Sequence, residues 1–149
     1  MNQRFFDIDF KVQGNPIALK RHRSFQKGNF RGTYDPSSDD KANFLVKAIA
    51  YKPEIPLDEP LFVKFTFCFA RPKNHYKTGK NAHILKDDAP KWRTSTPDVD
   101  NLEKFVGDAL NGIFWKDDSK IVDMSGSKPY GEQPYIQIQI VRLNKFNKN

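Results

Sequence analysis

The chain has 149 residues, of which 38% are hydrophobic and 13% aromatic, a composition typical of a folded protein rather than of a disordered segment. This length predicts one domain with a substantial hydrophobic core. The formal net charge of +7 indicates an anionic polymer as partner, although a merely soluble basic domain would show the same charge.

Several classes of protein are excluded at this stage. No apolar run approaches the roughly 18 residues that cross a bilayer, so we expect no membrane association. Residues 1–7 lack the apolar segment of a signal peptide. Cys68 is the single cysteine, which excludes an internal disulfide, and its apolar surroundings predict a buried core thiol. We therefore expect a reducing, cytoplasmic location.

Residues 5–12 alternate between apolar and polar side chains and predict a first strand, which Gly14-Asn15-Pro16 ends. Residues 18–33 then mix basic with aromatic side chains, contain no acid, and predict a loop or a loose hairpin. Such a mixture suits phosphate contacts combined with stacking on an exposed base. A solvated basic loop explains it equally well. The candidate DNA-contacting residues here are Lys20, Arg21, Arg23, Lys27 and Arg31.

A turn at residues 35–40 leads into a predicted helix, whose buried side comprises Phe44, Leu45, Ala48, Ile49 and, less securely, Tyr51. A Pro-rich linker ends at Pro60. Residues 61–70, with the sequence LFVKFTFCFA, form the strongest strand pattern in the chain. Their near-continuous apolarity predicts a central strand covered on both faces.

Residues 71–95 form a long polar connection, and a connection of this length is more often functional or mobile than inert. His75 and His83 lack the spacing of a zinc site. Trp92 is expected to anchor the loop, with stacking on a nucleotide as the alternative. The basic residues that we expect to contact DNA here are Arg71, Lys73, Lys77, Lys91 and Arg93.

Two more strands are predicted at residues 121–128 and 135–143, separated by a turn at 131–134 and followed by a polar tail at 145–149. The pattern as a whole predicts one α+β domain over residues 1–149. We expect a mixed sheet of about four strands and two main helices.

The stretch from Thr96 to Asp118 concentrates the chemistry of the chain. Pro97 biases its approach toward extended geometry, so Asp98 and Asp100 should project from the same face. Asp100 should cap a helix, with Glu103 completing a capping box and Gly112 marking the end. The apolar stripe of this helix is expected to be Leu102, Phe105, Val106, Ala109, Leu110 and Ile113.

A second acidic pair, Asp117-Asp118, follows this helix. Carboxylates repel one another, and Mg²⁺, which prefers carboxylate oxygen, offsets that repulsion well. Lys104 lies one turn inside the helix and is placed to stabilise an anionic intermediate. Aspartates at helix starts and in turns are also common for structural reasons, so spacing alone leaves both interpretations open.

The segment Pro97-Asp98-Val99-Asp100-Asn101-Leu102, with Lys104, Asp108-Ala109-Leu110 and Trp115 to Val122 (WKDDSKIV), resembles the RusA family of Holliday junction resolvases. These are small DNA endonucleases, often of prophage origin. Lys128 matches a lysine at the end of the following strand. The resemblance is specific over residues 96–128 and looser elsewhere, and the 71–95 segment departs from the shortest members.

The resemblance implies that Asp98, Asp100 and Asp118 bind Mg²⁺, for which we expect Mn²⁺ to substitute, and that Lys104 is the catalytic lysine. Supporting roles fall to Asp117, Asp108 and Lys128. The family acts as a homodimer on four-way junction DNA in recombination and repair, since two symmetric nicks need two dyad-related sites. Two alternatives remain: a flap, fork or less selective DNA nuclease, and a non-catalytic basic DNA-binding module with a structural Asp cluster.

Overall fold

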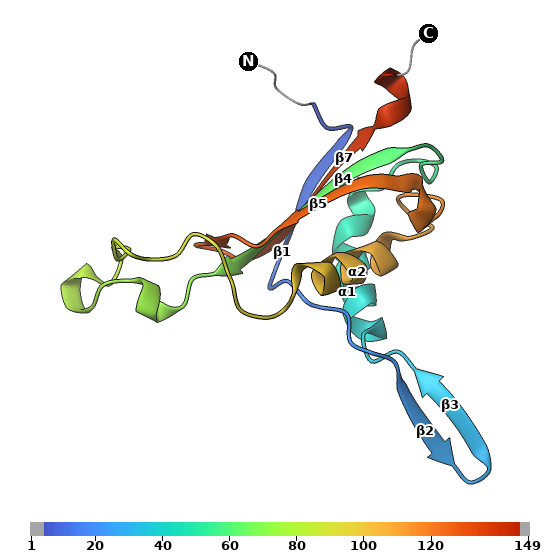
Figure 1. Ribbon diagram of the computed structural model, residues 1–149, viewed down its shortest axis with the longest axis horizontal. Helices are drawn as coiled ribbons and strands as arrows, with labels where there is room; N and C mark the ends of the chain where they lie inside the picture. Colours follow the sequence, from blue (N-terminus) through green and yellow to red (C-terminus); the bar gives the residue numbers. More distant parts are fainter. Residues whose placement is uncertain (1–4, 147–149) are drawn as a thin grey trace.

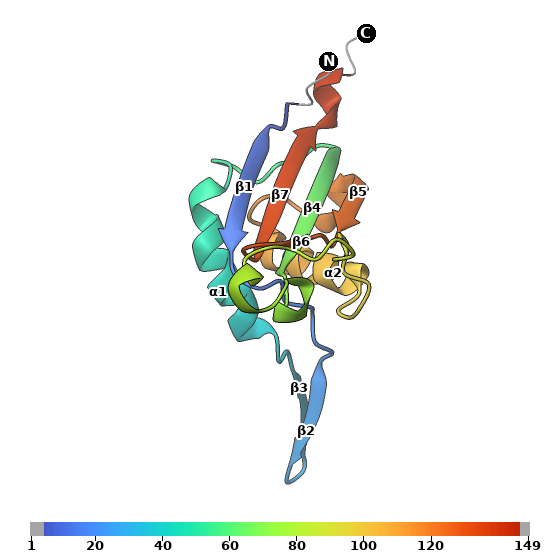
Figure 2. The same ribbon diagram turned by 90° about the vertical axis from the view of Figure 1, so that its left-hand side faces the viewer.

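The computed structural model describes residues 5–146 and shows a mixed sheet with two helices on one of its faces (Figures 1 and 2). The strand order is β1-β7-β4-β5, and a short β6 also pairs with β4. The α+β prediction is confirmed, with five strands in the sheet where about four were expected. The strands are β1 (Ile8–Gln13), β4 (Leu61–Ala70), β5 (Ile121–Ser127), β6 (Tyr130–Gly131) and β7 (Tyr135–Arg142).

Strand β4 is central because it pairs antiparallel with β7 and parallel with β5 and β6. Its alternate residues Leu61, Val63, Phe65, Phe67 and Phe69 face the helices and are buried. The prediction that both faces of this strand are covered is wrong, because Lys64 lies exposed on the opposite face, beside Gln139 of β7. The apolar run therefore combines one buried face of β4 with two apolar residues, Phe62 and Cys68, on its opposite face. Cys68 is buried, as predicted.

Helices α1 (Ser38–Ala48) and α2 (Val99–Leu110) supply the other half of the core. In α1, Phe44 and Ala48 are buried, whereas Ile49 is exposed at the start of a short 3₁₀ turn, Ile49–Tyr51. The predicted stripe of α2 is confirmed: its five members within the helix are buried, and Ile113 beyond its end is half-buried. Gly112 adopts φ +79° after the last helical turn, a conformation that glycine accepts without strain.

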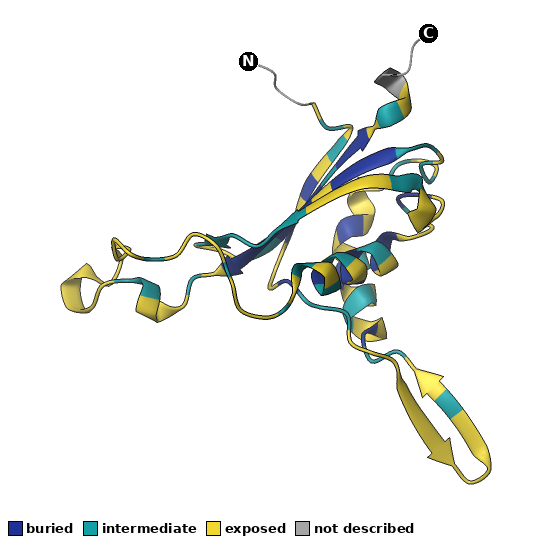
Figure 3. Cartoon of the chain, in the orientation of Figure 1, coloured by how far each residue is buried: buried dark blue, intermediate teal, exposed yellow. Residues whose placement is uncertain are grey.

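Two segments project from this body (Figures 1 and 3). The first is an antiparallel hairpin of β2 (Arg23–Lys27) and β3 (Phe30–Tyr34), which we call the ribbon. The second, residues 71–95, contains two 3₁₀ turns, Lys73–His75 and Gly79–Asn81, and is called the arm. Trp92 is half exposed, at 51%, and the arm is held instead by main-chain hydrogen bonds of its neighbours Lys91 and Arg93.

The C-terminal part of the described chain forms a 3₁₀ turn, Leu143–Phe146, so the predicted polar tail begins within ordered backbone. Residues 147–149 of that tail, and residues 1–4 at the other end, lie outside the described residues. No helix in the described part of the chain is both long and apolar enough to span a bilayer.

Candidate functional site

The start of α2 differs from the prediction in a way that matters for the acidic pair. Asp98, with φ −70° and ψ 146°, is the N-cap residue, and its carbonyl oxygen accepts from the Leu102 amide at 3.2 Å. Asp100 therefore lies in the first helical turn rather than at the cap. The predicted capping box is wrong, because helical geometry begins at Val99. The extended geometry from which the same-face projection of the two carboxylates was predicted ends at Asp98, and the joint role of the two acids stays a prediction. Both acids still lie at the positive end of the helix dipole.

Two basic side chains hold the backbone that leads into Asp98. The ammonium group of Lys128 donates to the carbonyl oxygens of Ser95 and Pro97, at 2.9 and 2.8 Å. The guanidinium of Arg93 donates to the carbonyl oxygen of Thr96 through Nε and Nη2, at 3.0 and 2.6 Å. Lys128 and Arg93 together thus fix three consecutive residues, Ser95 to Pro97, and the supporting role of Lys128 stays a prediction.

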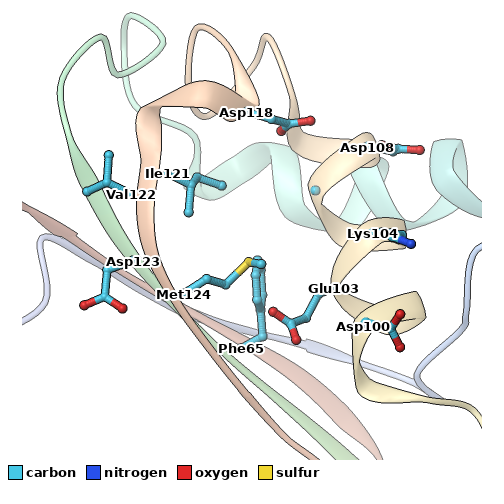
Figure 4. A pocket seen from close by; sticks show the side chains of 11 residues that line it. Phe65, Asp100, Glu103, Lys104, Asp108, Asp118, Ile121, Val122, Asp123 and Met124 are labelled. Carbon is cyan, nitrogen blue, oxygen red and sulfur yellow. The ribbon is translucent and has the colours of Figure 1, made fainter.

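A pocket of about 390 Å³ lies between α2 and β5 (Figure 4). Asp100, Glu103, Lys104 and Asp108 line it from the helix, and Asp118 lines it from the turn before β5. Three of the four predicted catalytic residues, Asp100, Lys104 and Asp118, therefore border one cavity, together with the predicted supporting residue Asp108. Asp98 is exposed at the N-cap and is not among the lining residues. The remaining lining residues are Phe65, Gly107, Ile121, Val122, Asp123 and Met124.

The turn that carries Asp118 is fixed by a buried tryptophan. Trp115, which is fully buried, donates its indole N–H to Asp118 Oδ1 at 2.8 Å. Its main chain also bridges back to Leu57 and Asn111, which secures the turn against the end of α2. A hydrogen bond from a rigid donor orients one oxygen of Asp118 and leaves the second for another ligand.

Asp117 stabilises the turn itself. Its Oδ2 accepts from the backbone N–H of Ser119 at 2.9 Å, at the start of the 3₁₀ turn Asp118–Lys120. Hydrogen bonds from the side chain and the backbone of Ser119 hold the pKa of Asp117 below its usual range. Asp117 does not line the pocket.

Glu103 is a pocket residue that the sequence interpretation missed, because it assigned this side chain to a capping box. The residue is half-buried, and in Figure 4 its carboxylate points toward β5, close to Met124 and Phe65. Burial, with a smaller contribution from the charge of Asp100, raises the pKa of Glu103. The sequence did contain one indication that Glu103 is half-buried: on the predicted helix it lies beside Leu102 and Val106, at the edge of the apolar stripe. Asp123 of β5 was also missed, and a register shift in the β4–β5 pairing places it opposite Phe62.

Asp108 links the two helices. Its carboxylate lies 3.8 Å from the ammonium group of Lys41 in α1, and Lys41 also forms an ion pair with Asp35. The supporting role expected for Asp108 stays a prediction. Along the exposed side of α2, Asp100, Lys104 and Asp108 follow one another at intervals of four residues, so they share one face of the helix.

The fit of a magnesium ion rests on the chemistry of these donors. The pocket presents carboxylates and one lysine, without imidazole or thiol, which matches the oxygen preference of Mg²⁺. Within residues 5–146, however, no three acidic, His or Cys side chains come together at metal-binding distances. The triad of Asp98, Asp100 and Asp118 stays a prediction that the donor types support.

The ten predicted DNA-contacting residues all lie on the ribbon, its approach, or the arm. Both arginines of the arm already have internal partners: Arg71 donates to the Pro90 carbonyl oxygen at 2.7 Å, and the Arg93 guanidinium also lies over the Phe69 ring. Lys73 and Lys77 of the arm are exposed. The arm therefore uses its arginines to hold its own shape and presents lysines to solvent.

Comparison with known proteins identifies the family to which the chain belongs. The family model "Endodeoxyribonuclease RusA" matches residues 13–141. The chain belongs to the RusA family of endodeoxyribonucleases. It is 33% identical over 138 residues to the uncharacterized protein YqaN of Bacillus subtilis (strain 168), a match that covers 89% of this chain and 94% of that protein. A second relative, the crossover junction endodeoxyribonuclease rusA of Lactococcus phage r1t, is 38% identical over 53 residues, or 35% of this chain and 40% of the phage protein.

Proposed function

We propose that this chain is a Mg²⁺-dependent endonuclease that resolves four-way DNA junctions by paired, symmetric phosphodiester hydrolysis in the cytoplasm, in recombination and repair. The observation that carries the proposal is the pocket that Asp100, Lys104 and Asp118 border in a chain of the RusA family. The similarity to a phage crossover junction endodeoxyribonuclease supports the choice of substrate.

In this proposal Asp98, Asp100 and Asp118 hold the metal, and Mn²⁺ substitutes for it. A bound Mg²⁺ supplies water activation at neutral pH and neutralises charge on the scissile phosphate. Trp115 orients the Asp118 carboxylate through its 2.8 Å hydrogen bond. Lys128 and Arg93 fix the backbone before Asp98, and Lys104 places its positive charge on the same helix face as Asp100, where it stabilises the developing phosphate charge.

The protein acts as a homodimer, because two symmetric nicks in a two-fold junction require two dyad-related sites. The large apolar side chains of β4 that face α1 and α2 are buried in the core and are not available for this contact. Sedimentation at micromolar concentration should give a dimer, and a monomer under those conditions would refute this part.

A substrate panel tests the function. Four-way junctions, flaps, forks and plain duplexes of one sequence are incubated with the protein in Mg²⁺ and in EDTA. The proposal expects Mg²⁺-dependent cutting of the junction above all others. Preferred cutting of flaps or forks would assign a different nuclease, and binding without any cleavage would leave a DNA-binding module.

The same panel tests how DNA is held. If 6–10 lysines and arginines contact phosphates, junction affinity should fall by about 10³- to 10⁵-fold between about 50 and 200 mM salt. A nearly flat salt dependence would contradict the assignment of the ribbon and the arm to phosphate binding.

A further inference from the structure

Packing against the rest of the described chain does not account for the side chains that the ribbon exposes. Every residue of β2 and β3 is exposed except Gly32, which is half-buried, so the ribbon adds little to the core (Figure 3). An isolated two-stranded hairpin is only marginally stable in water. Its two-residue turn, Gly28-Asn29, has a positive φ of 61° at Gly28 alone, which matches the type II′ pattern of tight hairpins.

One face of the ribbon is aromatic. The register Phe25↔Gly32 and Lys27↔Phe30 places Phe25, Phe30 and Tyr34 on the same side. The Phe25 ring lies 5.9 Å from that of Phe30 and 6.3 Å from that of Tyr34, so the three rings form a row. Gly32 makes room for this row, because a Cβ at that position would lie 2.7 Å from Phe25 Cζ. Phe30, next to the turn, is the most exposed of the three at 63%.

The charges around this row are of one sign. Five basic residues and no acidic one lie between Ala18 and Tyr34. Lys20 forms an ion pair with Asp40 at 3.9 Å, whereas none of the other four pairs with an acidic side chain within residues 5–146. Exposed cations beside exposed rings complement a polymer with a phosphate on one side and a flat base on the other.

The ribbon is attached beside the candidate active site. The backbone N–H of Leu19, just before its basic segment, donates to the carbonyl oxygen of Asn101 at 3.2 Å. Asn101 directly follows Asp100 in the first turn of α2. The base of the ribbon therefore lies next to the acids that we propose to hold the metal, and the hairpin projects from there away from the body (Figure 1).

We propose that the ribbon binds unpaired bases of branched DNA, which stack on Phe30 and its aromatic row while the cations contact the flanking phosphates. A two-stranded ribbon also fits the major groove of duplex DNA, but reading base edges there requires hydrogen-bonding side chains. The exposed phenylalanines have none, and stacking is the contact that they offer. This inference takes branched DNA as the substrate from the proposed function, and it does not depend on whether the chain cleaves that DNA.

The test measures binding in EDTA by fluorescence anisotropy, with a labelled short oligothymidylate, a matched duplex and a four-way junction as probes. Phe30→Ala should bind the oligothymidylate about 5- to 150-fold more weakly, the range expected for one lost stacking contact, and the duplex almost unchanged. Phe30→Trp should bind like the unaltered chain. Phe30→Leu, which keeps an apolar side chain but no flat ring, should behave like Phe30→Ala.

Phe5→Ala is the matched control, since Phe5 is an exposed phenylalanine that precedes β1 and lies outside the ribbon. The inference is overturned if Phe30→Ala binds the oligothymidylate normally, if duplex binding falls equally, or if Phe30→Leu retains full affinity. Loss of self-association in Phe30→Ala, with DNA binding intact, would assign the face to a second copy of the chain and refute the proposal. Junction cleavage is scored separately: an unaltered chain that never cuts refutes the proposed function and leaves the binding result standing.

Discussion

Gly126 of β5 sits where the first turn of α2 approaches the sheet closely. A Cβ at this position would lie 2.8 Å from Glu103 Oε1 and 2.9 Å from Val99 Cγ2, both closer than real Cβ contacts occur. The Glu103 carboxylate ends a flexible side chain and can swing aside. Val99 cannot, because a β-branched residue in a helix has one strongly preferred rotamer. Gly126→Ala should therefore push the first turn of α2 away from β5.

The size of the effect follows from this clash. Inserting a methyl group into a packed contact costs about 1–3 kcal/mol. For a protein of this size that lowers Tm by roughly 2–12 °C. Val99 lies between Asp98 and Asp100, so both acids move with it. A displacement of about 1 Å at a catalytic group can reduce the rate by about 100-fold.

The assay combines thermal unfolding, junction cleavage in Mg²⁺ and junction binding in EDTA. Gly126→Ala should lower Tm and cleavage but leave binding unchanged, and Val99→Ala in the same chain should restore part of both losses. Gly107→Ala is the matched stability control. Its Cβ would meet nothing closer than Asp118 Oδ1 at 4.0 Å, and alanine should stabilise the helix by about 0.4–1 kcal/mol. A Gly126→Ala chain with unchanged Tm and unchanged cleavage would refute the packing that we describe.

Three further variants test individual contacts. Trp115→Phe removes the donor to Asp118 and should cost about 1.5–3 kcal/mol in urea unfolding while weakening the response of cleavage to Mg²⁺; equal Mg²⁺ titrations would contradict the orienting role. Lys128→Met should reduce cleavage without reducing junction affinity, because its ammonium group holds the backbone before Asp98; a selective loss of affinity would instead make Lys128 a DNA contact. Burial raises the pKa of the Cys68 thiol above its ordinary 9.0. The stability that this group contributes is therefore present below pH 9.0 and is lost as the pH rises through the raised pKa. The unaltered chain should lose stability relative to Cys68→Ala only above pH 9.0, and parallel curves of stability against pH would refute this.

The elements with strong periodicity were predictable from the sequence. The stripe of α2, the strand at Leu61–Ala70 and the helix around Phe44 follow from spacing alone, since their apolar residues need a common buried face. Gly28 and Gly32 indicated the hairpin. The polar outer face of β4 was missed because a short apolar run does not reveal which residues a neighbouring strand leaves uncovered.

The site was less predictable, because it depends on contacts between distant segments. Pro97 predicted extended backbone before the acidic pair, but residues 95–97 form a bend and the helix begins at Val99, so Asp98 is the N-cap residue and Asp100 lies in the first turn. Local sequence could not show that Glu103 faces Gly126 or that Trp115 holds Asp118. The positioning role of Lys128 likewise appears only when β5 is paired with β4 beside the start of α2.

The most direct test of the central claim maps the cuts on a synthetic four-way junction with each strand end-labelled in turn. The unaltered chain is compared with Asp100→Asn and with Asp123→Asn, a pocket acid outside the proposed metal triad. The account predicts paired, symmetric nicks that require Mg²⁺, are abolished in Asp100→Asn with junction binding preserved, and persist in Asp123→Asn. Normal cutting by Asp100→Asn, or cutting that continues in EDTA, would contradict it.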